Sequence, residues 1–423
     1  MLAHRFRQLD CLLTAERRWW QYQPYHHLGI AFAHEAPALA KCLAALTLDE
    51  IAHLDGDMDA LCTLLAPWIP AGAELQALGE LAPFAPEPVQ CARAMAMYMP
   101  GRKQGQIEAF TGCLPPHQGP YLEWCAGKGH LGRLVSLHRG AEILSLEWQG
   151  ALCEEGRRLA ARDGANMRFV EADAFAAESG ALIAPHHHAM ALHACGDLHT
   201  HLLTRVAEGR AQGVTLSPCC YHLIRGEHYA PLSRAARASA LRLGKSDLKL
   251  PLQETVTGGT RIARLREREV VWRLAFDCLQ RQVRGVDEYL PVPNLQKSLL
   301  TGDFEDFCHW AAERKGMGLP AGLDYAALLA QGERRFGDVA RMELVRHLFR
   351  RPLEIWLLLD RALFLGEQGY RVEVGTFCPK PMTPRNLLIR AVRAGGDLSK
   401  RPHRSDGCGR KTWGWIPLQT SAI

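Results

Sequence analysis

Short apolar segments alternate with longer amphipathic segments from residue 121 onward, and this alternation constrains the fold more than any other feature. The pattern is typical of βαβ units, in which parallel strands form a sheet and the intervening helices cover its faces. We predict five strands, at residues 121–125, 142–147, 167–171, 188–193 and 213–217. The sequence therefore predicts an α/β domain built on a parallel sheet.

Helical segments flank this region on both sides. Residues 1 to about 105 carry apolar side chains at three- and four-residue spacing, and Thr47-Leu48-Asp49-Glu50 has the capping-box pattern of a helix start. Helical periodicity returns after residue 261, and residues 370–376 and 387–392 are predicted to form a terminal hairpin. We expect a helical accessory domain at 1–105, a core at 106–260, a helical insertion at 261–365, a hairpin completing the core sheet at 366–394 and a loosely ordered basic tail at 395–423.

The composition is that of an ordinary globular protein, with 48% hydrophobic and 22% charged residues in a chain of 423. The most apolar late stretch, residues 355–365, is too short to span a bilayer and contains Asp360 and Arg361, so we expect no membrane span. The basic start of the chain is not followed by a secretory apolar run. The 14 cysteines are therefore expected to be free thiols in the cytoplasm.

A glycine-rich loop follows the first predicted strand, at the edge where sheets of this kind bind ligands. Gly127 and Gly129 allow the backbone to turn sharply and to approach a ligand closely. Glu147 ends the second strand about twenty residues later, where a carboxylate can accept hydrogen bonds from ribose hydroxyls. Asp173 follows the third strand and precedes Phe175, a pair suited to an adenine amino group and ring face. Their order and spacing favour an adenosyl cofactor.

The glycine spacing alone does not identify the cofactor, because Gly127, Gly129 and Gly132 also satisfy the G-x-G-x-x-G pattern of dinucleotide-binding proteins. Two features favour S-adenosylmethionine. Glu123 precedes the loop, where its carboxylate could hold the methionine amino group directly or through water, and the chain ends with an antiparallel hairpin. The predicted cofactor-binding residues are Glu123, Cys125, Gly127, Lys128, Gly129, Glu147, Asp173 and His193.

Four motifs make the interpretation more specific: E-W-C-A-G-K-G-H-L from Glu123, H-A-C-G-D from His193, C-C-Y-H from Cys219 and P-R-N-L-L-I from Pro384. They resemble the methyltransferase-domain family that includes the methyltransferase-like twenty-five proteins and the C-terminal half of the glutathione S-transferase C-terminal-domain-containing protein. The resemblance covers residues 99–225 and 355–392. It implies a class I, Rossmann-like methyltransferase sheet that uses S-adenosylmethionine, and Arg102-Lys103 resembles the family's Lys-rich stretch ahead of the first strand.

Cysteines gather at one edge of the sheet that this fold implies. The first, fourth and fifth strands of a methyltransferase sheet are neighbours, so Cys125, Cys195, Cys219 and Cys220 are expected near the methyl group of the cofactor. Three interpretations stay open. The thiols pack as small buried side chains, or Cys195, Cys219 and Cys220 bind a metal together with His222 although a vicinal cysteine pair is poor chelate spacing, or they take part in catalysis.

The catalytic interpretation gives each residue at this edge a chemical role. Asp197 or His222 could take a proton from the acceptor, and Tyr221 offers a stacking face for a planar substrate. Cytosine-C5 methylation of RNA uses cysteines after the fourth and fifth strands, places that Cys195 and Cys219 occupy, and His193 or Lys128 could lower a thiol pKa there. The predicted catalytic residues are Asp197, Cys195, Cys219, Cys220, Tyr221 and His222, with no metal assigned.

Basic residues concentrate in the C-terminal third of the chain. Eight Lys and Arg residues face two acidic ones between Arg385 and Lys411, and six arginines precede them, at positions 334, 335, 341, 346, 350 and 351. They form either a solvated helix face with a frayed tail or a phosphate-binding surface. With Tyr221 near the site, RNA is the first expectation for the acceptor. The alternatives are a protein or small metabolite, or a non-catalytic protein that binds an adenosyl ligand or RNA.

Overall fold

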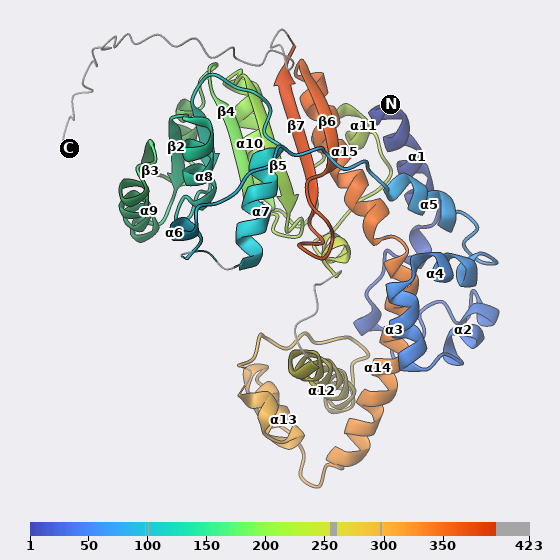
Figure 1. Cartoon of the computed structure of the whole chain (residues 1–423). Coiled ribbons are helices and arrows are strands. Elements are labelled where there is room, and N and C mark those ends of the chain that lie inside the picture. Colours follow the sequence, from blue (N-terminus) through green and yellow to red (C-terminus); the bar gives the residue numbers. More distant parts are fainter. Residues whose placement is uncertain (98, 100, 254–259, 297, 395–423) are drawn as a thin grey trace, which may run out of the picture.

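A seven-stranded sheet forms the centre of the protein, with strand order β3-β2-β1-β4-β5-β7-β6 (Figure 1). The computed structural model describes residues 1–97, 99, 101–253, 260–296 and 298–394, so the predicted basic tail at 395–423 lies outside the described residues. The strands are β1 (Tyr121–Trp124), β2 (Ile143–Glu147), β3 (Met167–Glu171), β4 (His188–Cys195), β5 (Gly213–Cys219), β6 (Tyr370–Thr376) and β7 (Leu387–Arg393).

The predicted strands are confirmed, but three of them end elsewhere at the ligand-binding edge, where β1 stops at Trp124 instead of Cys125. Strands β1 to β5 are parallel, and β7 lies antiparallel between β5 and β6. β4 and β5 each run two residues beyond the predicted ends, to Cys195 and Cys219, which pair with each other after a register shift that follows Leu192. Hydrophobic pattern did not mark these two residues as strand because the bulge interrupts the alternation.

Strand order separates the two cofactor classes that the glycine spacing left open. β1 pairs with both β2 and β4, so the order of connections reverses there and creates the ligand crevice. The dinucleotide-binding order places a parallel sixth strand beside β5, whereas here the neighbour of β5 is the antiparallel β7. The predicted class I, Rossmann-like methyltransferase fold is therefore confirmed.

Helices cover both faces of the sheet. α7 (Gly101–Gly112) and α8 (His130–Arg139) share one hydrophobic cluster with Tyr121 and Met190. On the other face, α10 (Asp197–Glu208) and α15 (Arg350–Glu367) pack in a second cluster with Leu122 and Leu146. The remaining helices around the sheet are α6 (Arg93–Ala96), α9 (Gly150–Asp163) and α11 (Arg234–Arg237).

The N-terminal region is helical, as predicted, and packs along α15 rather than beside the cofactor edge (Figure 1). Its helices are α1 (Leu2–Ala15), α2 (Pro37–Ala44), α3 (Leu48–Gly56), α4 (Met58–Leu65) and α5 (Gly72–Gly79). The predicted capping box is confirmed, because Thr47 accepts from the Glu50 backbone N–H and the Glu50 carboxylate accepts from Thr47 N–H. Phe6 packs on Trp356 of α15, with ring centroids 5.2 Å apart, so this region shares the core of the sheet domain.

A helical lobe projects away from the sheet, formed by α12 (Thr260–Arg284), α13 (Phe304–Arg314) and the start of α14 (Tyr325–His347) (Figure 1). It has a hydrophobic cluster of its own, centred on Phe276 and Phe307. α15 lies outside this lobe, against β6 and β7.

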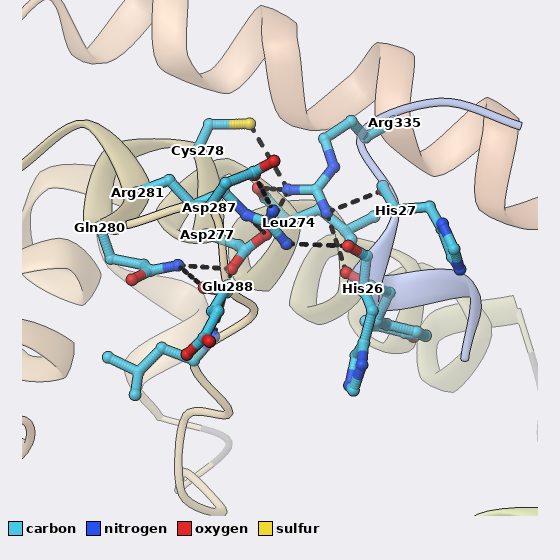
Figure 2. Close-up of polar contacts among 12 residues, drawn as sticks. His26, His27, Leu274, Asp277, Cys278, Gln280, Arg281, Asp287, Glu288 and Arg335 are labelled. Carbon is cyan, nitrogen blue, oxygen red and sulfur yellow. Dashed lines mark hydrogen bonds and ion pairs between the residues drawn. The ribbon is translucent and has the colours of Figure 1, made fainter. Parts of the chain in front are cut away.

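A buried carboxylate anchors the lobe to the N-terminal region (Figure 2). Asp277 is fully buried and accepts from Arg281 Nε at 2.9 Å and from Arg335 Nη1 at 2.7 Å. The two guanidinium groups also donate to the backbone carbonyls of Tyr25, His26 and His27. Because the arginines reach across to that loop, Asp277 holds both parts together.

The arginines upstream of the hairpin do not form a phosphate-binding surface, and this part of the prediction is wrong. Arg341 donates to the carbonyls of Leu43 and Leu46, and Arg346 is buried and donates to Trp20 and Glu343. Arg335, Arg350 and Arg351 are engaged by Asp277, Asp55 and Glu354. Of the six, Arg334 is exposed. The solvated-face alternative fails for the same reason, since the guanidinium groups join helices to one another.

The described cysteines are all free thiols, in agreement with the prediction. Within the described ranges, the helices are too short or too polar for any of them to cross a bilayer.

Replacing Asp277 should be far more costly than replacing the other partner of Arg281. Asp277→Ala leaves Arg281 and Arg335 buried without their anion, and we expect a loss of about 3–5 kcal/mol of unfolding free energy. Asp287→Ala removes an 80% exposed partner of Arg281 and should cost at most about 1 kcal/mol. Denaturation followed by tryptophan fluorescence measures both, and equal losses would contradict the assigned role of Asp277.

Candidate active site

The glycine loop lies between β1 and α8 with an open space in front of it. Gly127 has a φ of 57° and no atom within 4 Å of the position that a Cβ would take. Gly129 has a φ of 65°, and a Cβ there would lie 2.5 Å from the Phe169 ring. A Cβ on Gly132 would lie 2.5 Å from Glu123 Oε2. The first glycine therefore leaves room for a ligand, and the other two allow close packing beneath the loop.

Glu147 at the end of β2 holds this loop through its carboxylate. It is 5% exposed, and its two carboxylate oxygens accept from the backbone N–H groups of Gly127 at 2.9 Å and of Gln149 at 3.0 Å. A carboxylate has about four acceptor positions, so two remain for ribose hydroxyls. The geometry fits the role predicted for Glu147 in an adenosyl site.

Trp148, which sequence reasoning overlooked, directly follows Glu147 and is 68% exposed. A large indole left open to solvent at the ligand edge of a sheet offers a flat apolar face for a ring. The sequence could have indicated this residue, because an aromatic side chain directly after Glu147, the last residue of the second strand, lies at the edge where ligands bind. On the next loop, the predicted pair Asp173 and Phe175 is engaged within the protein. Asp173 is exposed and its carboxylate accepts from the Phe175 backbone N–H at 2.9 Å. The Arg225 guanidinium lies over the Phe175 ring, 4.9 Å from its centroid.

Glu123 is buried under the loop rather than exposed to a ligand. It is 3% exposed, and its Oε2 accepts from Ser145 Oγ at 2.9 Å. Burial raises the pKa of Glu123 to about 7, against the lowering effect of hydrogen bonds from Ser145 and the Gly132 backbone. The predicted direct contact with a methionine amino group has no support in this arrangement. Glu123 instead fixes the first turn of α8.

Two lysines extend the site from opposite sides. Lys128 is exposed in the glycine loop, and Lys103 is half-buried on α7. Burial lowers the pKa of Lys103, although the nearby Glu123 carboxylate opposes the shift. The Arg102-Lys103 stretch that the resemblance pointed to therefore lies beside the loop after β1.

Left-handed backbone conformations gather at the carboxyl edge of the sheet. Four non-glycine residues have a positive φ in the described part of the chain, and three of them lie at this edge: Cys125 at 57° directly after β1, His193 at 79° in the irregular last part of β4, and Cys220 at 48° directly after β5. Such residues cost of order 1–3 kcal/mol each and are typical of functional sites. This edge is therefore held in a strained conformation by the surrounding fold.

Three of the four predicted cysteines come together. The Sγ atoms of Cys195, Cys219 and Cys220 all lie within 4.8 Å of one another, and Cys195 and Cys219 are 3.5 Å apart. Hydrogen bonds from Cys195 and Cys219 lower the pKa of Cys220, while those with Cys195 and Cys220 raise the pKa of Cys219. Cys125 lies outside this group, and burial raises its pKa to about 12. We name Cys195, Cys219 and Cys220 the thiol cluster.

Tyr221 does not present a stacking face, so this prediction is wrong. Its side chain is 1% exposed, with the Arg361 guanidinium 5.1 Å from the ring centroid and His199 packed edge-on at 6.2 Å. Because Cys220 turns the chain with a left-handed φ, the next side chain points into the core. The aromatic group that sequence reasoning expected at the acceptor position is a core residue.

The two predicted bases, Asp197 and His222, differ in their hydrogen bonding. Asp197 starts α10 and its Oδ2 accepts from the Arg225 backbone N–H at 2.7 Å, which fixes the loop after β5. His222 is half-buried, and its Nδ1 has no hydrogen-bond partner in the part of the chain that the structure describes. His222 does not belong to the thiol cluster, so the predicted set of four metal ligands is not assembled.

A family match includes the segment that forms this edge, and two solved structures show a weak similarity to the chain. Residues 102–227 match the family described as methyltransferase domain. The structure of the Pyrococcus abyssi tRNA (uracil-54, C5)-methyltransferase in complex with S-adenosyl-L-homocysteine is 14% identical, with a TM-score of 0.23, over 27% of this chain and 28% of that one. The 23S rRNA methyltransferase ErmE is 17% identical, with a TM-score of 0.22, over 63% of this chain and 99% of that one.

The family match and the geometry agree. The matched segment contains the glycine loop, Glu147 and the thiol cluster. Residues 102–227 therefore match a methyltransferase domain, and the glycine loop with Glu147 fits the adenosyl cofactor that the sequence predicts. It spans 28% of the length of the tRNA methyltransferase.

The burial of Glu123 predicts a specific pH dependence of stability. Its folded pKa of about 7 lies above the ordinary value of 4.5, so the folded state holds the proton more tightly. Stability should fall by up to about 3 kcal/mol as pH rises from 4.5 to 7. Glu123→Gln keeps the acceptor and removes the charge, so its melting temperature should rise relative to the wild type across this window. Glu171→Gln, an exposed change, is the control; parallel pH curves for Glu123→Gln and wild type would contradict the prediction.

Proposed function

We propose that this protein is an S-adenosylmethionine-dependent methyltransferase of class I that methylates RNA. One observation supports the cofactor site best: the space beside Gly127 is open, and the Glu147 carboxylate accepts from the Gly127 backbone N–H next to that space. Bound at this edge, S-adenosylmethionine would supply an electrophilic methyl group. The protein would work in the cytoplasm, as its free thiols suggest.

The chain's own residues serve mainly to position the reactants. Glu147 would hold the ribose, and the exposed Trp148 indole and the Phe175 ring, on the next loop, would lie beside the adenine. Methyl transfer needs in-line alignment and, for a hydroxyl or amine acceptor, removal of a proton. Asp197 and His222 flank the loop after β5, where an acceptor would enter, and they are the candidates to take that proton.

The support for RNA comes from cations at the mouth of the crevice. Lys103, Lys128 and Arg225 lie on three different segments around the cofactor edge, and Lys128 and Arg225 are exposed. Phosphate groups bind such cations, and their release of counterions makes binding depend on salt. Five of the six arginines of α14 and α15 that the sequence singled out, all except the exposed Arg334, are engaged within the fold and are not counted in this surface.

Calorimetric titration with S-adenosylmethionine tests the cofactor site. Glu147→Gln removes a charged acceptor, and hydrogen bonds to charged groups contribute about 1.5–3 kcal/mol, so binding should weaken about 10- to 150-fold. Glu171→Gln is the matched control, because Glu171 pairs with Glu147 in the register of β2 and β3 and is exposed. Melting curves verify folding. Equal affinity of both variants for S-adenosylmethionine would contradict the role of Glu147. If the wild type does not bind S-adenosylmethionine, the proposal that the protein is a methyltransferase is wrong.

Methyl transfer from labelled cofactor tests the acceptor. Total RNA, total protein and the small-molecule fraction from a deletion strain are offered separately to the wild-type protein and to Glu147→Gln. We expect label in RNA, reduced by Glu147→Gln and by raising the salt concentration. Arg225→Ala should weaken RNA methylation more than it weakens cofactor binding, which is titrated separately because the Arg225 side chain also covers the Phe175 ring. Label confined to protein or to the small-molecule fraction would show that the acceptor is not RNA.

A further inference from the structure

The thiol cluster is assembled by the backbone rather than by sequence spacing. Cys195 and Cys219 are partners in the parallel register of β4 and β5. Neighbouring side chains of a strand normally point to opposite faces, so Cys220 would diverge from Cys219. Its φ of 48° instead brings its sulfur within 4.8 Å of both others. This turn overcomes the objection that a vicinal pair chelates poorly.

The spacing of the sulfurs fits a shared ion. A tetrahedral zinc ion with Zn–S bonds of about 2.3 Å keeps its sulfur ligands about 3.8 Å apart. The separation of 3.5 Å between Cys195 and Cys219 is close to this value, whereas a disulfide requires about 2.05 Å. No other group of three potential ligands with this proximity occurs in the described ranges.

The alternatives explain less of the arrangement. If the cysteines only filled space, alanine or serine would serve equally well, and the unfavourable left-handed conformation of Cys220 would have no purpose. Cys219 is only 6% exposed and cannot reach a substrate, and a nucleophilic role for the half-buried Cys195 or Cys220 would leave the third sulfur unexplained. A soft divalent ion satisfies all three sulfurs at once.

We propose that Cys195, Cys219 and Cys220 bind one zinc ion at the carboxyl edge of β4 and β5. Three protein ligands leave the fourth position of a tetrahedral ion open, as in catalytic zinc sites. That position lies at the same sheet edge as the loop after β1, so a water or an acceptor atom would complete the coordination. The ion would also rigidify the strained turn at Cys220.

Metal analysis of the full chain, purified without chelators from zinc-supplemented cells, tests the site. We expect about one zinc per chain in the wild type. Cys219→Ser and Cys220→Ser should each lower zinc retention at least tenfold after dialysis. Cys125→Ser is the matched control at the same edge, and Cys308→Ser is a buried control in the helical lobe; both should keep the ion. A zinc ratio near zero in the wild type, or full retention in a Cys219→Ser, Cys220→Ser double variant, would overturn the proposal.

A second measurement covers the case in which a cysteine variant fails to fold. Native wild-type protein is alkylated before and after removal of zinc by a chelator, and the modified residues are mapped by mass spectrometry. Zinc should protect Cys195, Cys219 and Cys220, and its removal should expose them, while Cys125 should not change. Protection unaffected by the chelator would overturn the site. Cofactor titration stays a separate readout, so loss of the zinc site and loss of the methyltransferase assignment can be told apart.

Discussion

Two adjacent charged residues buried in α15 join this helix to α10 and to the segment after β5. Asp360 accepts from the Tyr229 hydroxyl and from the backbone N–H groups of Leu232 and Ser233. Arg361 donates to His199 of α10 and covers the Tyr221 ring. The same helix packs on β6, α1 and α5. Because an uncompensated buried charge costs several kcal/mol, this network fixes the segment after β5, which carries one side of the cofactor edge.

Most of the fold could be predicted because hydrophobic periodicity reports burial directly. β3 and β6 were predicted to the residue, since apolar runs bounded by polar turns define their ends. Hydrophobic periodicity does not predict which charged residues are buried in the core. Asp360 and Arg361 were understood only as charges that interrupt an apolar stretch, and Arg346 as a surface cation, yet all three are buried with partners. Those partners lie far away in sequence, so no local pattern identifies them.

The positions of site residues could be predicted where these residues directly follow the ends of parallel strands. They could not be predicted where an unusual backbone conformation changes the direction of a side chain. Glu147 and Gly127 were placed correctly because parallel strands deliver their ends to one edge. Tyr221 was misplaced because nothing in the motif C-C-Y-H shows that Cys220 adopts a positive φ. Glu123 illustrates a third limit: its position was right, but only the packing of Gly132 and Ser145 around it reveals a structural role.

The distribution of strain shows how the fold and the site depend on each other. The left-handed residues Cys125, His193 and Cys220 lie at the ends of three adjacent strands. Each conformation is unfavourable alone and persists only where the surroundings over-determine it. Here the surroundings are fully buried strands and the α15 network behind Tyr221. The large shared core therefore does more than stabilise the chain, since its stability holds the cofactor edge in a conformation that an isolated sheet would relax.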